Sequence, residues 1–118
     1  MEMSEAISTR VVTQWENWKS QDAGNNAFIA EEYESWWPDG SRRVGKPTAE
    51  QMRAQPIADY TLSQFRAVPI GADAALFTYL AEVRVPIGGA EHHIAVGEFW
   101  VKRGGEQLIR AYSGTLIR

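Results

Sequence analysis

Three glycine-containing breaks divide the second half of the chain into long runs of strand-forming residues. The breaks are Ile-Gly-Ala-Asp at 70–73 and paired glycines at 88–89 and 104–105. The runs between them are rich in β-branched and aromatic residues, which predicts four strands. We place them near 59–69, 74–87, 90–103 and 106–117. Because short turns join consecutive antiparallel strands, this half of the chain is expected to form an antiparallel meander.

The first half of the chain carries helical patterns instead. One apolar stripe has helical spacing: Ile7, Val11, Trp15 and Trp18. It predicts a helix from about 4 to 21, and Asp22 can cap a second, shorter helix that carries residues 27–29. Thr48 followed by Gln51 matches a capping box and predicts a third helix. Helices first and a meander afterwards indicate a single α+β domain over residues 1–118, with the helices packed on one face of a curved antiparallel sheet.

Two adjacent tryptophans end an expected strand over 33–37. Trp36 and Trp37 precede the turn sequence Pro38-Asp39-Gly40. Neighbouring side chains on a strand point to opposite faces, so one indole is expected in the core. The other is expected at a cavity rim or under a partner chain.

One carboxyl group stands out on the predicted inner face of the meander. If Gly88-Gly89 is a two-residue loop, Tyr79 lies opposite Glu98 and Phe77 opposite Trp100. Burial of a carboxyl group raises its pKa toward the range of a general base, and Tyr79 can donate to it or to a substrate oxygen. The alternative is a structural carboxylate, paired with Arg66 or lying at an exposed strand end.

Aromatic residues are the strongest compositional feature. Five tryptophans exceed what the core of a small domain needs, and indoles favour pocket walls and interfaces. The predicted pocket residues lie on the inner face: Trp15, Trp18, Trp37, Phe77, His92, Trp100 and Ser113. A small apolar or aromatic molecule is the expected ligand.

The outer face of the meander is too apolar for a fully solvated surface. Leu80, Phe99, Tyr112 and Leu116 are predicted to point outward. A second copy of the chain is the simplest cover, so we expect a homodimer through this face.

Several classes of site and partner are not indicated. The chain has no cysteine, and its net charge of −3 favours neither nucleic acid nor an anionic membrane. No phosphate-binding glycine motif or cofactor signal is present. His92 and His93 point to opposite faces of a strand, so no metal site is expected there. The first ten residues lack an apolar run, so a cytoplasmic location is expected.

Four segments carry a family resemblance: YESWWPDGSRRVGK at 33–46, LSQFRAVPIGADAALFTYLAEV at 62–83, EFWVKRGGEQL at 98–108 and YSGTLI at 112–117. With the order of helices and strands, they resemble the nuclear-transport-factor-2-like (NTF2-like) superfamily. Within it, the likeness is to the SnoaL-like domains of unknown function. The resemblance implies a sheet bent into a cone around the first helix, a pocket at its wide end and dimers through the outer face.

Three functions follow from the residues and the resemblance. The first is a small-molecule-binding domain with an aromatic-lined pocket. The second is a cofactor-independent isomerase, dehydratase or cyclase in which Glu98 is the general base, by analogy with ketosteroid isomerases and SnoaL-like cyclases. The third is a dimerisation module without a ligand.

Overall fold

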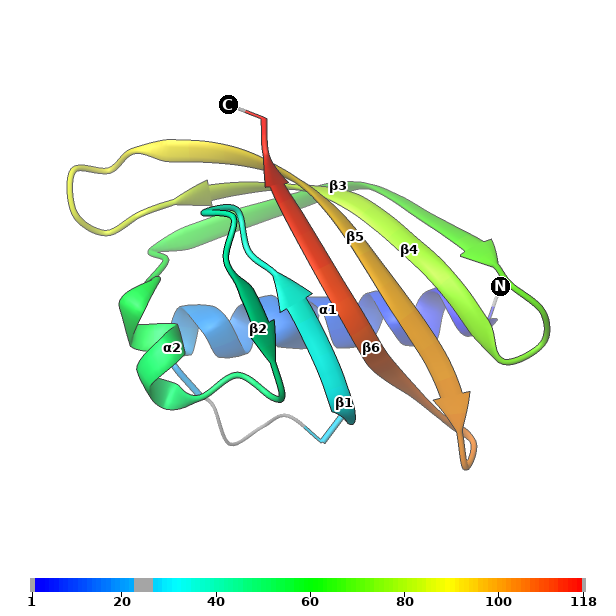
Figure 1. The fold of residues 1–118 in the computed structure, drawn as a ribbon. Helices are drawn as coiled ribbons and strands as arrows, with labels where there is room; N and C mark the ends of the chain where they lie inside the picture. Colours follow the sequence, from blue (N-terminus) through cyan, green and yellow to red (C-terminus); the bar gives the residue numbers. More distant parts are fainter. Residues whose placement is uncertain (1, 23–26, 118) are drawn as a thin grey trace.

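The structure is a computed structural model that describes residues 2–22 and 27–117. Along the chain, the elements are α1 (Glu2–Ser20), β1 (Ile29–Trp36), β2 (Arg42–Val44), α2 (Ala49–Ala54), β3 (Asp59–Pro69), β4 (Ala74–Arg84), β5 (Glu91–Arg103) and β6 (Glu106–Leu116). The strands form one bent sheet, and α1 lies across one of its faces (Figure 1). The predicted α+β architecture is confirmed.

The sheet is mixed rather than wholly antiparallel. Its strand order is β2-β1-β6-β5-β4-β3, and β1 pairs with β6 in parallel. The meander from β3 to β6 supplies the antiparallel pairs on one side, and the β1–β2 hairpin adds to the other edge. The core lies between α1 and the inner face of this sheet, where Ile7 and Val11 pack against residues of β4, β5 and β6.

The second predicted helix does not extend over 27–29. Residues 27 and 28 form a turn, and Ile29 opens β1. Residues 23–26 lie outside the described residues. Phe28 and Ile29 are buried in the core, and the Ile109 backbone N–H donates to the carbonyl of Phe28 at 2.9 Å. Pairing with β6 therefore outweighs the local helical pattern at this point.

The third predicted helix is confirmed as α2, together with its cap. The Thr48 side chain accepts from the backbone N–H of Gln51, and the Gln51 side chain accepts from the backbone N–H of Thr48, both at 3.1 Å. Met52 is the buried residue of this short helix. The cap fixes where α2 begins and so where Met52 meets the rest of the molecule.

The turn between β4 and β5 contains four residues, not two. The Val85 N–H donates to the carbonyl of Ala90 at 2.9 Å, which leaves residues 86–89 as the loop. The register is therefore two residues away from the predicted one: Tyr79 pairs with Val96, and Glu98 pairs with Phe77. Because side chains alternate with a period of two, this shift leaves every residue of both strands on its predicted face.

A β-bulge in β6 reverses the predicted faces near its end. The two-residue turn at 104–105 is confirmed, but Trp100 pairs with Ile109 and Phe99 with Ala111. Arg110 is the extra residue between these pairs. Beyond the bulge Tyr112 turns inward and Ser113 is exposed, so the predictions of an outward Tyr112 and an inward Ser113 are wrong.

The two adjacent tryptophans lie in different environments, as the alternation predicts. Trp37 is 6% exposed and Trp36 is 50% exposed. Trp37 is on the inner side, where the Arg43 guanidinium lies 3.5 Å from the centre of its ring. None of the described helices is long and apolar enough to cross a membrane.

Candidate functional site

A cavity of about 490 Å³ opens at one end of the sheet. Its walls come from the C-terminal half of α1, from α2, from β1 and from the inner face of β6, and the β4–β5 turn reaches its edge. Six aromatic residues line it: Trp15, Trp18, Phe28, Tyr33, Trp37 and Tyr112. Apolar walls with few polar groups are typical of sites for small organic molecules.

The tryptophans of the cavity are held in place by their own hydrogen bonds. Trp18 Nε1 donates to the backbone carbonyl of Gln55 at 2.5 Å, which ties α1 to α2. Trp37 Nε1 donates to the Ser35 hydroxyl at 2.9 Å, and its ring centre lies 4.5 Å from that of Trp18. Because these indole N–H groups already have acceptors, the walls offer a ligand apolar faces rather than donors.

A chain of hydrogen bonds leads from α1 to a buried carboxyl group on β5. Trp15 Nε1 donates to the Tyr79 hydroxyl at 2.8 Å, and that hydroxyl donates to Glu98 Oε2 at 2.5 Å. Trp100 Nε1 donates to Glu98 Oε1 at 2.9 Å, and Gln14 Nε2 donates to Glu98 Oε2 at 3.0 Å. Glu98 is 1% exposed, so three neutral donors replace the water that it loses on folding.

Burial raises the pKa of Glu98 to about 7, although its hydrogen bonds with Tyr79, Trp100 and Gln14 act in the opposite direction. Among residues 2–22 and 27–117, no basic side chain forms an ion pair with this carboxyl group. The suggested partner Arg66 pairs with Thr78 across β3 and β4 and is exposed. Glu98 can therefore take up or release a proton near neutral pH.

Three tyrosines surround this carboxyl group. Burial raises the pKa of Tyr33, Tyr79 and Tyr112, and the nearby charge of Glu98 raises each of them further. Their hydroxyl groups therefore remain protonated and able to donate at any physiological pH.

Gln14 connects Glu98 to the cavity. Glu98 and Tyr79 do not line the cavity, whereas Gln14 and Trp15 do. Gln14 Nε2 points to Glu98, and its Oε1 is buried without a hydrogen-bond partner among the described residues. The Gln14 side chain thus lies between the carboxyl group and the cavity, and its Oε1 is closed off from solvent.

Solved structures with this arrangement of helices and strands are numerous. An NTF2-like protein from Cytophaga hutchinsonii is similar over 99% of this chain and 100% of its own, with a TM-score of 0.83 and 12% identity. An NTF2-like protein of unknown function in nutrient uptake from Rhodospirillum rubrum covers 95% of this chain and 98% of its own, with a TM-score of 0.80 and 15% identity. This chain has an NTF2-like fold.

The association domain of CaMKII from C. elegans is also similar in fold to this chain. It matches 98% of the chain and 91% of its own length, with a TM-score of 0.76 and 16% identity. No protein-family model matches the sequence, and no curated protein is significantly similar to it. The likeness therefore establishes the fold, and the narrower SnoaL-like grouping stays a prediction.

The NTF2-like sheet brings some predicted site residues together and separates others. Trp15, Trp18, Trp37 and His92 line the cavity. Phe77 and Trp100 are buried in the core behind it, and Ser113 lies outside it because of the bulge in β6.

Sequence reasoning missed several cavity residues, among them Gln14, Phe28, Tyr33 and Tyr112. Gln14 stands seven residues after Ile7 and three after Val11, so its place on the buried helical stripe was readable from the sequence. The inward position of Tyr112 could not be predicted, because nothing in the sequence marks the bulge in β6.

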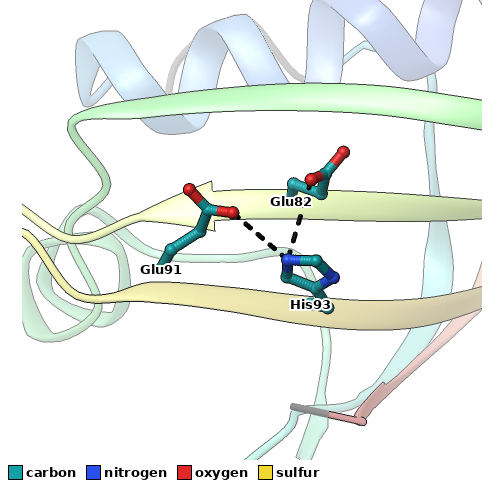
Figure 2. Close-up of side chains that lie close together, drawn as sticks. All are labelled: Glu82, Glu91 and His93. Carbon is teal, nitrogen blue, oxygen red and sulfur yellow. Dashed lines mark hydrogen bonds and ion pairs between the residues drawn. The ribbon is translucent and has the colours of Figure 1, made fainter.

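The two adjacent histidines point to opposite faces of β5, as predicted. His92 lines the cavity, and His93 lies on the outer face with Glu82 and Glu91 (Figure 2). His93 Nε2 is 3.2 Å from Glu91 Oε1 and 3.6 Å from Glu82 Oε1, and the three candidate ligand atoms lie within 4.8 Å of one another. A proton on Nε2 of His93 lets this partly exposed ring donate a hydrogen bond to the neighbouring carboxylates, which explains the geometry. The cluster by itself therefore does not indicate a metal ion.

Proposed function

We propose that this protein binds a small apolar or aromatic molecule in the cavity between α1, α2 and the sheet. The observation that carries the proposal is the combination of aromatic walls with a volume of about 490 Å³. Trp15, Trp18 and Trp37 offer the ligand apolar aromatic surface rather than donors, since each indole N–H is bonded within the protein. Contact with aromatic surface favours an apolar or aromatic molecule.

Catalysis by Glu98 is the second candidate function, and its raised pKa of about 7 is the observation in its favour. An isomerase, dehydratase or cyclase would use this carboxylate as base and the Tyr79 hydroxyl as donor. A general base must come within hydrogen-bond reach of the proton that it removes. Glu98 lies behind Gln14 and Trp15, so a reaction requires Gln14 to move aside. Binding without chemistry needs no such movement.

Filling the cavity tests the binding function. Ile57 lines the cavity, and the next residue, Ala58, is exposed. We expect Ile57→Trp to weaken binding of an aromatic probe such as 2-naphthol at least tenfold in equilibrium dialysis, and Ala58→Trp to leave it unchanged. If both variants bind as the wild type does, the cavity is not the binding site.

A homodimer through the outer face of the sheet is the proposed assembly. Exposed or half-buried apolar residues gather on this face: Trp36, Leu76, Leu80, Phe99, Val101 and Leu108. Phe99 lies between Leu76 on β4 and Ala111 on β6, so the patch crosses three neighbouring strands. The similarity to a domain named for association gives independent support. Tyr112 and Leu116 are not part of this patch, because both line the cavity instead.

A further inference from the structure

The three tyrosines around Glu98 differ in what their hydroxyl groups are bonded to. The Tyr79 hydroxyl donates to Glu98 Oε2, and the Tyr33 hydroxyl forms a hydrogen bond with the Ser35 side chain. The Tyr112 hydroxyl has no hydrogen-bond partner among residues 2–22 and 27–117, and it keeps accessible surface. Since Tyr112 lines the cavity, its hydroxyl is available to a group from outside the protein.

The Tyr112 hydroxyl lies above Gly114, at the end of the sheet where the cavity opens. Because side chains alternate along a strand, Tyr112, Gly114 and Leu116 share the inner face of β6. A Cβ atom at Gly114 would lie 2.7 Å from the Tyr112 hydroxyl and 3.2 Å from Ile94 Cγ2. The tyrosine therefore leans along β6 toward Ile94 and Leu116, which pair with each other and both line the cavity. Glycine at position 114 leaves the space that the hydroxyl occupies.

The Tyr112 hydroxyl keeps its proton. Burial, together with the charge of Glu98, raises the pKa of Tyr112 above its ordinary value of 10. The group is therefore a donor throughout the physiological pH range. A carbonyl oxygen accepts hydrogen bonds and cannot donate them, so it is the simplest partner for this donor.

The charges around the cavity disfavour an anionic ligand. Asp22 and Asp39 line it, and His92 is the one basic side chain among the described residues that do so. Besides burial, the charge of Glu98 raises the pKa of Tyr112, so it also acts on a carboxylate held at this hydroxyl. An acceptor without a charge avoids this repulsion.

We propose that Tyr112 anchors the ligand as a hydrogen-bond donor, and that the ligand is a neutral apolar or aromatic molecule with a carbonyl oxygen directed at this hydroxyl. This inference rests on the proposed binding function and names the ligand class for the same cavity. The aromatic walls contact the body of the molecule, and Tyr112 fixes its orientation.

Three probes of similar shape test the inference at pH 8 by equilibrium dialysis. They are 2-acetylnaphthalene, a ketone; 2-isopropenylnaphthalene, in which a CH₂ group replaces the carbonyl oxygen; and 2-naphthoate, an anion. We expect Tyr112→Phe to bind the ketone on the order of fivefold more weakly than the wild type, the value of one ordinary hydrogen bond. The variant should bind the hydrocarbon as well as the wild type does, or better. The wild type should bind 2-naphthoate on the order of tenfold more weakly than the ketone.

The infrared carbonyl band of the bound ketone reports the hydrogen bond directly. Donation to a carbonyl oxygen weakens the C=O bond, so we expect the band at a lower frequency on the wild type than in a hydrocarbon solvent. This measurement needs no substitution. In Tyr112→Phe the band should return toward its position in the hydrocarbon solvent.

Tyr60→Phe is the matched control. The Tyr60 hydroxyl bonds to Glu16, and Tyr60 does not line the cavity. This variant should bind the three probes as the wild type does and leave the carbonyl band of the bound ketone unchanged.

The possible results separate this inference from the function on which it rests. Equal losses of affinity for the ketone and the hydrocarbon in Tyr112→Phe would overturn the donor role, as would an unshifted carbonyl band on the wild type. Binding of 2-naphthoate as tight as that of the ketone would overturn the neutral ligand class. Each of these results leaves the binding function standing. Absence of binding by all three probes would overturn the proposed function together with the inference.

Discussion

The Tyr79 hydroxyl donates to Glu98 Oε2 at 2.5 Å, although the two residues do not face each other across the sheet. Tyr79 pairs with Val96, and Glu98 pairs with Phe77, so the bond runs diagonally between β4 and β5. A tyrosine side chain is long enough to reach a diagonal neighbour. Folding therefore removes the Glu98 carboxyl group from water and leaves it hydrogen-bonded to neutral donors alone.

The first prediction concerns how stability depends on the charge of Glu98. Its folded pKa of about 7 lies above the ordinary value of 4.5, so the unfolded chain releases this proton at lower pH than the folded one. The contribution of Glu98 to the unfolding free energy therefore falls as the pH rises from about 4.5 to about 7, by on the order of 3 kcal/mol. Glu98→Gln removes this contribution. We expect the variant to gain stability relative to the wild type between pH 5 and pH 8, measured by urea denaturation.

Other acidic groups change the unfolding free energy with pH in the opposite direction, so the curve of the variant is subtracted from that of the wild type. Hydrogen bonds with Arg103 lower the pKa of Glu32 to about 2, and those with Arg42 lower the pKa of Glu34. Their contribution is present at neutral pH and lost toward acid, in the wild type and in the variant alike. Only the difference between the two proteins reports on Glu98. Parallel curves from pH 5 to pH 8 would mean that this carboxyl group titrates normally.

The second prediction removes the central hydroxyl group. Tyr79→Phe takes the acceptor from Trp15 Nε1 and a donor from Glu98, and leaves the ring in the core. Leaving a buried donor unpaired costs about 1–3 kcal/mol of unfolding free energy. Since the lost bond lowers the pKa of Glu98, we expect that pKa to rise further, which carboxyl-carbon NMR can follow.

Tyr60→Phe is the control for this measurement. Tyr60 also bonds to a carboxylate, Glu16, but that carboxylate is exposed. The control is expected to change stability by less than about 1 kcal/mol and to leave the Glu98 titration unchanged. An equal loss of unfolding free energy in both variants would mean that burial does not make the Tyr79 hydrogen bonds more important for stability than the exposed bond of Tyr60.

The sequence allowed the fold to be predicted because independent signals agreed. The stripe of Ile7, Val11 and Trp15, the capping box at Thr48 and the glycine turns each predict an element that the structure contains. The predicted inner face of β4 and β5 is also right, since a register error of two residues leaves faces unchanged. Agreement between local propensity and global packing is what makes such a chain predictable.

The parts that escaped prediction depend on tertiary structure. The bulge at Arg110 is not marked by glycine or proline, so the faces of Tyr112 and Ser113 came out reversed. The parallel pairing of β1 with β6 joins residues about eighty positions apart and has no local signal. The hydrogen bond between Gln14 and Glu98 joins residues 84 positions apart and likewise has no local signal.

The third prediction tests the face reversal beyond the bulge. A Cβ atom at Gly114 would lie 2.7 Å from the Tyr112 hydroxyl and 3.2 Å from Ile94 Cγ2. Gly114→Ala therefore overpacks the inner face, and we expect a loss of about 1–3 kcal/mol in unfolding free energy. Gly97 lies on the outer face, where an added Cβ meets nothing within 4 Å. Gly97→Ala should be neutral or stabilising by up to about 1 kcal/mol, since glycine is unfavourable within a strand. A larger loss of unfolding free energy in Gly97→Ala than in Gly114→Ala would place Gly114 on the outer face.

The last prediction concerns assembly. Phe99 is at the centre of the outer apolar patch, between Leu76 and Ala111. A lysine there would bury its ammonium group without a partner in the proposed dimer, at a cost that exceeds what a small interface can offset. We expect the wild type to sediment as a dimer at micromolar concentration and Phe99→Lys as a monomer of 13.2 kDa. Ile70→Lys is the control, because Ile70 is 51% exposed but follows the end of β3, away from the patch centre. A dimer that survives Phe99→Lys would place the interface elsewhere, and a monomeric wild type would exclude it altogether.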